Sequence, residues 1–93
     1  MILSFGNRET EKIYNGERIA KLALEIQRIG LRKLIILDQS QDIKDLIIPP
    51  SNRLEKLKGD RKDYYSIRIN DRWRIIFKWI NNDAYNVEII DYH

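Results

Sequence analysis

The apolar residues in the first half of the chain recur at the spacing of an α-helix. From position 22 onward, the main apolar stripe consists of Leu22, Ile26, Ile29, Leu34 and Leu37. The charged side chains of the same segment fall on the other side of a helical projection, so the segment is amphipathic. This pattern predicts a helix over about 22–39, and residues 41–46 are compatible with one further helical turn.

A shorter helix is predicted ahead of this one. Asn7 is a favourable N-cap, Glu9 and Glu11 suit the N-terminal turn of a helix, and Asn15-Gly16 is a typical stop signal. These signals bound a helix over about 8–14. The apolar residues 1–5 that precede it are compatible with a strand.

The hydrophobic period changes to two at position 64. Residues 65–69, 73–79 and 85–89 each alternate apolar with polar or charged side chains, and short Asn- and Asp-containing turns separate them. This pattern predicts three strands in an antiparallel meander. Pro49-Pro50 interrupts the helical pattern, so residues 49–63 are predicted to form a long loop.

The alternation also predicts a strand register, because cross-strand partners must share a face of the sheet. Pairing Ile69 with Trp73 and Trp79 with Tyr85 also sets Trp73 opposite Asp91. One face then carries Ile67, Ile69, Trp73, Ile75, Phe77, Val87 and Ile89. This apolar face is predicted to pack on the second helix.

The opposite face of the predicted sheet places Arg68 across from Arg74. Like charges directly opposite each other destabilise a sheet, so an anionic ligand would explain the pair better than folding does. The alternative is that the two side chains splay into water or pair with Glu88, whose strand phase matches.

The length and composition set limits on the kind of protein. A chain of 93 residues suits one domain spanning 1–93, and no Cys is available for a disulfide, a thiolate nucleophile or a zinc site. Its single His excludes a multi-His metal site. No apolar run approaches the ~20 residues that cross a bilayer, and charged residues at 8–12 interrupt any signal peptide. We therefore expect a cytoplasmic protein without a membrane partner.

Positive charge and aromatic residues are concentrated in the second half of the chain. Residues 53–78 hold nine Lys and Arg against four Asp and Glu, a net charge of +5, and seven of the nine aromatic residues lie between positions 64 and 92. Cations interleaved with aromatics suit a polyanion with stackable bases. The alternative is an ordinary sheet with aromatic core residues and a solvated charged face.

Two residues of this half are candidates for proton transfer. His93 is the only imidazole, and a His is well suited to acid–base chemistry near neutral pH, although terminal residues often fray. Glu55 lies among the cations of the 49–63 loop, which would keep it ionised and able to accept a proton unless it pairs with Lys58 or Arg61.

Three segments of the sequence resemble HigB-type toxins of the RelE/ParE superfamily. They are residues 52–61, the hairpin of residues 65–70 and 73–77, and the terminal Asp91-Tyr92-His93. The resemblance implies an α+β fold with two N-terminal helices packed on a twisted antiparallel sheet. It also implies the toxin of a type II toxin–antitoxin module, neutralised by a HigA-like helix-turn-helix antitoxin. Active members of the family cleave mRNA in the A site of the ribosome.

The resemblance also suggests roles for individual residues. Family positions carry over onto Lys58, Arg74 and the three terminal residues, whereas Glu55 stands where some members have a catalytic His. We assign His93 as general acid, Glu55 as base with Asp91 as runner-up, and Tyr92 as a stacking or orienting group. Lys58, Arg68 and Arg74 would hold the phosphate. The remaining predicted RNA contacts, in the ribosomal RNA or the substrate, are Arg53, Lys56, Arg61 and Arg72.

The implied reaction needs no metal or other cofactor. A ribose 2′-OH attacks the adjacent phosphate and leaves a 2′,3′-cyclic phosphate and a 5′-OH, with a base, an acid and a cationic cluster supplied by side chains. Two other classes stay open at this stage. One is a non-catalytic gyrase poison like the ParE branch, and the other is an inactive module that binds nucleic acid or a protein partner.

Overall fold

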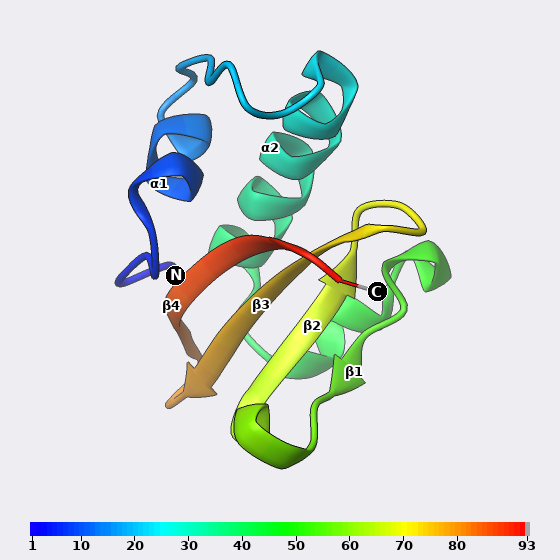
Figure 1. Ribbon diagram of the computed structural model, residues 1–93. Coiled ribbons are helices and arrows are strands. Elements are labelled where there is room, and N and C mark those ends of the chain that lie inside the picture. Colours follow the sequence, from blue (N-terminus) through cyan, green and yellow to red (C-terminus); the bar gives the residue numbers. More distant parts are fainter. Residues whose placement is uncertain (93) are drawn as a thin grey trace.

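Two α-helices lie against one face of a four-stranded antiparallel sheet in the computed structural model, which describes residues 1–92 (Figure 1). The helices are α1 (Arg8–Tyr14) and α2 (Leu24–Gln39). The strands are adjacent in chain order and are β1 (Glu55–Lys56), β2 (Tyr64–Arg68), β3 (Trp73–Ile80) and β4 (Asp83–Asp91). Short 3-10 helices form at Ile43–Ile47, Pro50–Asn52 and Gly59–Arg61. The predicted α+β class is confirmed.

Both predicted helices form, and one begins later than expected. The Asn7 side chain caps α1 by accepting a hydrogen bond from the Thr10 amide at 2.9 Å. Helix α2 begins at Leu24 rather than at 22 because Gln27 holds the preceding turn. The buried Gln27 side chain donates to the carbonyls of Ile19 and Leu22, at 2.8 and 2.7 Å. The described helices are all too short or too polar to cross a membrane.

The three predicted strands form as β2, β3 and β4, but the predicted loop over 49–63 also contains a fourth, short strand. In β1, Glu55 pairs with Ser66 and Lys56 pairs with Tyr65 of β2. Both β1 residues are exposed, so the strand has no apolar alternation that a sequence pattern could reveal. This short edge strand brings the basic loop alongside the hairpin.

The predicted register is correct for β2 and β3 and shifts by one residue in part of β4. Arg68 lies opposite Arg74, and Trp73 lies opposite Asp91, as predicted. Trp79, however, pairs with Ala84 rather than with Tyr85. A bulge between Ile76 and Lys78 causes the shift, and Asn86 adopts a left-handed φ of 54° within it.

The core lies between α2 and the apolar face of the sheet. Leu34 and Leu37 of α2 meet four fully buried sheet residues, which are Ile67, Ile75, Phe77 and Val87. Each such side chain contributes about 1.5–3 kcal/mol by leaving water. The predicted inward face is therefore confirmed, except that Trp73 is only partly buried.

Residues 1–5 run along the outer edge of β4 without forming a strand of their own. Ile2 and Phe5 make isolated parallel bridges to Ala84 and Val87. The Met1 amino group also pairs with Asp83 at 3.4 Å. These contacts cover one edge of the sheet and leave β1 at the other.

Candidate active site

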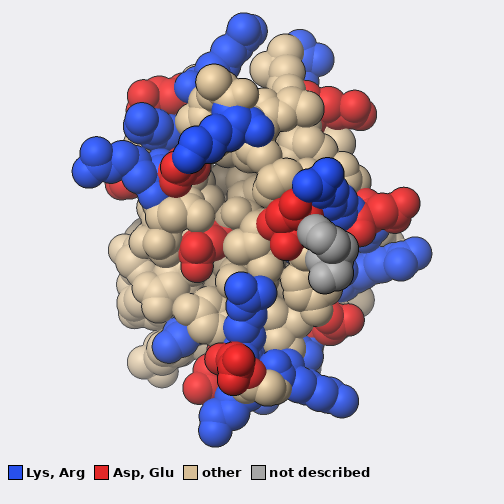
Figure 2. All heavy atoms as spheres, in the orientation of Figure 1, with Lys and Arg blue, Asp and Glu red and all other residues tan. Residues whose placement is uncertain are grey.

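The face of the sheet turned away from the helices, called here the open face, carries most of the predicted site. The strand register places Glu55, Ser66 and Ile76 in one row and Arg68 and Arg74 in the next. Figure 2 shows Lys and Arg side chains interleaved with carboxylates at the end of the molecule that holds β1 and the turn into β2. Cations and carboxylates from separate segments thus share one surface.

The Arg74 side chain is held on the open face by two hydrogen bonds. Its Nε donates to the Ser66 hydroxyl at 2.8 Å, and its terminal nitrogen donates to the Arg53 carbonyl at 2.7 Å. The guanidinium also lies 5.5 Å from the centre of the Tyr92 ring. Burial lowers the pKa of Arg74, and the negative charge of Glu55 opposes that shift. Because its direct partners are neutral, Arg74 keeps its full charge for a ligand.

A buried amide anchors the loop that supplies the Arg53 carbonyl. Asn52 is fully buried, and its Nδ2 donates to the carbonyls of Leu46 and Ile48 at 3.1 and 3.3 Å. Its Oδ1 accepts a hydrogen bond from Lys33 of α2. Arg53 follows with a left-handed φ of 45°, a conformation that costs a residue with a Cβ about 1–2 kcal/mol. Helix α2 thereby fixes the backbone oxygen that holds Arg74.

Two adjoining hollows lie between the loop after β1 and Tyr92. The first, about 520 Å³, is lined by Glu55, Lys56, Leu57, Lys58 and Tyr92. The second, about 410 Å³, shares three of these residues and adds Asp60 and Arg61. Within residues 1–92, Glu55 makes no ion pair with Lys58 or Arg61. We call the two hollows together the Tyr92 groove.

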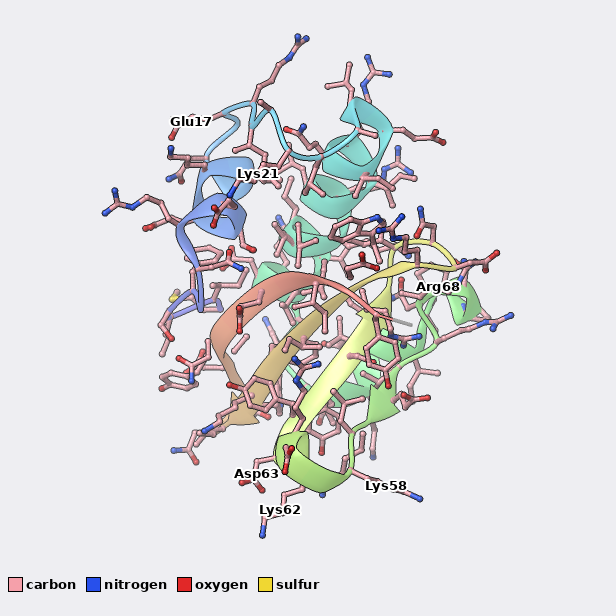
Figure 3. The ribbon with its side chains drawn as sticks, in the orientation of Figure 1. Glu17, Lys21, Lys58, Lys62, Asp63 and Arg68 are labelled. Atoms are coloured by element: carbon pink, nitrogen blue, oxygen red, sulfur yellow. The ribbon has the colours of Figure 1, made fainter. Side chains whose placement is uncertain are left out.

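Arg68 is separated from the Tyr92 groove. It forms an ion pair with Asp71, whose pKa is lowered by that hydrogen bond and by the charge of Arg68. Figure 3 shows Arg68 beside the β2–β3 turn, whereas Lys58 extends from the loop after β1 at the other end of the sheet. The structure therefore does not gather Lys58, Arg68 and Arg74 into one cluster, and the alternative pairing of the arginines with Glu88 is not observed either.

The C-terminal strand is tied to the β2–β3 turn. Arg72 holds Asp91 through two contacts of 2.8 and 2.6 Å, and this carboxylate raises the pKa of Arg72. The Tyr92 amide donates to the Arg72 carbonyl at 2.6 Å, which fixes the backbone that carries the Tyr92 ring. His93, the predicted acid, lies outside the described residues.

Sequence reasoning missed the residues that hold Arg74 in place. Ser66 could have been found, because strand alternation places this hydroxyl on the same face as Arg74. Asn52 and Lys33 gave no usable signal, because their contact joins a loop to a helix 19 positions away. Among residues 1–92, no group of three or more His, Cys, Asp or Glu side chains could hold a metal ion.

Comparison with known proteins identifies the family. A family model described as the RelE-like toxin of type II toxin-antitoxin system HigB matches residues 3–93. The chain belongs to this family. The HigB-like chain is 40% identical over 87 residues to Toxin HigB-1 of Vibrio cholerae, covering 92% of each chain. It is 37% identical over 98 residues to Endoribonuclease HigB of Proteus vulgaris, covering 100% of each.

A solved structure shares the fold of the HigB-like chain. The YoeB-YefM complex from Staphylococcus aureus contains a chain that aligns with a TM-score of 0.63 and 18% identity, covering 100% of this chain and 98% of that one. Identity this low supports the fold alone. The RelE-like fold and the resemblance read from the sequence are both confirmed.

Proposed function

We propose that this HigB-like toxin is an endoribonuclease that cleaves mRNA in the A site of a translating ribosome. The observation that carries the proposal is the Tyr92 groove, which lies beside a guanidinium held by neutral partners. The printed name of the Proteus vulgaris relative, Endoribonuclease HigB, supports the same reaction class. Its ribosomal setting follows from the family resemblance.

Arg74 and Lys58 would hold the scissile phosphate. Arg74 has a fixed position, and Lys58 lines the groove without an ion pair among the described residues. Cations set in advance where charge develops stabilise a pentacovalent transition state without reorganising during the reaction. Tyr92 would stack on a base, since its ring lines the same groove.

Glu55 would take the proton from the ribose 2′-OH. It lines the groove, and its charge acts on the Arg74 guanidinium. His93 would protonate the departing 5′-oxygen, an assignment that rests on its being the only imidazole of the chain. Asp91, held by Arg72, is the second candidate for the base. The products would be a 2′,3′-cyclic phosphate and a 5′-OH, without a metal ion.

The partner in the host would be a HigA-like helix-turn-helix antitoxin that neutralises the toxin. Three of the predicted RNA contacts, Arg53, Arg68 and Arg72, lie outside the groove lining, whereas Lys56 and Arg61 belong to it. All five would contact RNA backbone, in the ribosomal RNA or the substrate. Such contacts add affinity with little sequence preference.

The test is cleavage of an mRNA on purified translating ribosomes, followed by analysis of the product ends. We expect a 2′,3′-cyclic phosphate, and a single 2′-deoxy substitution at the cleaved nucleotide should abolish the reaction. His93→Gln should lower the rate by about 10²–10⁴-fold with unchanged folding. A phosphorothioate at the scissile position should give no rescue by thiophilic metal ions.

Two outcomes would contradict the proposal. Intact mRNA together with arrested DNA supercoiling would indicate a gyrase poison. RNA binding without cleavage by the folded wild-type chain would indicate an inactive binding module.

A further inference from the structure

A third hollow lies where β2 begins and β3 ends, outside the Tyr92 groove. Its volume is about 290 Å³, and its lining residues are Lys56, Asp63, Tyr65, Lys78, Trp79 and Ile80. Lys56 also lines the groove that contains Glu55 and Tyr92, so one side chain borders both spaces. We call the third hollow the Lys78 pocket.

The aromatic walls of the Lys78 pocket are fixed by the core. Phe77 is fully buried, the Tyr65 ring stacks on it at 6.1 Å, and the Trp79 ring meets it edge-on at 6.2 Å. Both outer rings stay partly exposed. Within residues 1–92, neither the Tyr65 hydroxyl nor the Trp79 N–H makes a hydrogen bond, and neither is a buried unsatisfied group. These rings can therefore receive a planar ligand without a large entropy cost.

The charges around the Lys78 pocket favour an anion next to these rings. Lys56 Nζ lies 6.0 Å from the ring centre of Tyr65. Lys78 also belongs to the lining, and its Nζ lies 5.5 Å from the ring centre of Tyr64, its cross-strand neighbour on the open face. Asp63, labelled in Figure 3 beside the turn into β2, is the one carboxylate of the lining and forms no ion pair among the described residues. Two cations therefore border the space against one carboxylate.

We infer that the Lys78 pocket is a second nucleotide site, which takes the base and phosphate of a nucleotide flanking the one in the Tyr92 groove. The inference rests on the proposed function in one respect, since both sites would hold the same RNA strand. Aromatic faces beside Lys side chains match the two parts of a nucleotide, because bases stack and phosphates need cations. Lys56, which borders both spaces, would contact the phosphate between the two nucleotides.

Binding of short single-stranded 2′-O-methyl oligonucleotides tests this inference, because such RNA cannot be cleaved by 2′-OH attack. Lys78→Gln should weaken binding and reduce the slope of log affinity against log salt by about 0.7, the value for one phosphate contact on a single strand. Asp63→Asn should act in the opposite direction and tighten binding. Lys12→Gln and Glu11→Gln, exposed positions of α1 with the same changes in charge, are the matched controls.

Tryptophan fluorescence supplies an independent readout. The chain has two Trp residues, and only Trp79 lines the Lys78 pocket. Base stacking should quench the emission of the wild type and of Trp73→Phe, whereas Trp79→Phe should lose the quenching. The Trp79→Phe variant keeps an aromatic ring beside Phe77, so we expect it to fold. All variants are compared at equal folded fraction.

The outcomes separate this inference from the proposed function. Cleavage by the wild type together with control-like RNA binding by Lys78→Gln and Asp63→Asn would overturn the second site alone. Pocket-dependent binding without any cleavage would support the site and contradict the endoribonuclease. If Lys78→Gln weakened binding of the antitoxin and left RNA binding unchanged, the pocket would be a protein-docking site and the inference would be wrong.

Discussion

Two neighbouring parts of the sheet use the same residue types in different ways. At the β2–β3 turn, Arg68 pairs with Asp71 and Arg72 pairs with Asp91. Around the Tyr92 groove, Arg74 is held instead by a hydroxyl and a backbone carbonyl. Neutral partners orient a guanidinium without cancelling its charge, whereas carboxylates do both. The groove is therefore the part of the surface where positive charge stays available to a phosphate.

The sharpest test of this comparison concerns the two candidate bases. Glu55 lies in the Tyr92 groove, and Asp91 lies at the β2–β3 turn. Glu55→Gln should lower cleavage by about 10²–10⁴-fold, because the amide cannot accept the 2′-OH proton. Asp91→Asn should cost less, because its ion pair with Arg72 gives it a role in holding the C-terminal strand. Single-turnover cleavage on ribosomes measures both variants. A larger loss for Asp91→Asn would transfer the role of base to that residue.

Substitution of the two facing arginines, Arg68 and Arg74, should also reduce cleavage to very different extents. Arg74→Ala should reduce cleavage by about 10²–10³-fold, the usual cost of one pre-positioned transition-state donor. Arg68→Ala should reduce it by less than about tenfold, in line with one peripheral phosphate contact. Equal losses would show that the ion pair with Asp71 does not set Arg68 apart. Urea unfolding of both variants provides the control, since a large loss of stability would make Arg74 a structural residue.

Strand alternation was enough to predict that these arginines face each other, but it could not predict their different surroundings. The register of β2 and β3 follows from the apolar residues 67, 69, 73 and 75, whose burial fixes the face of every neighbour. The partners of Arg74 depend on an exposed two-residue strand and on a left-handed Arg53, neither of which has a hydrophobic signal. The bulge at Asn86 was missed because Tyr85 continues the apolar alternation of Val87 and Ile89 in the sequence, whereas the structure buries Ala84 instead.

A smaller effect is expected at the residue that orients Arg74 without touching RNA. Ser66→Ala removes one of the two acceptors of the guanidinium, and the Arg53 carbonyl remains. We expect the cleavage rate constant, measured at a saturating concentration of ribosomes, to fall by about 3- to 10-fold. The reason is that a hydrogen bond of this kind contributes about 1 kcal/mol. Ser66→Thr, which keeps the hydroxyl, should recover most of the loss. A purely structural role for Ser66 would instead lower the unfolding midpoint without this pattern of rescue.

The smallest expected effect is the pH dependence of stability at the β2–β3 turn. Arg68 lowers the pKa of Asp71 in the folded chain, so the unfolded chain binds this proton more readily. The stabilisation is therefore complete above the ordinary Asp pKa of about 4 and is lost as the pH falls through the lower, folded value. Asp71→Asn should lower the urea midpoint slightly at pH 7 and have no effect in acid once the wild-type carboxylate is protonated. Because the pair is exposed, salt should also screen the difference at pH 7. If the urea midpoints of wild type and Asp71→Asn still differed in acid or in high salt, the effect would come from the shape of the turn and not from the ion pair. The charge of Arg68 would then be as available to a ligand as that of Arg74.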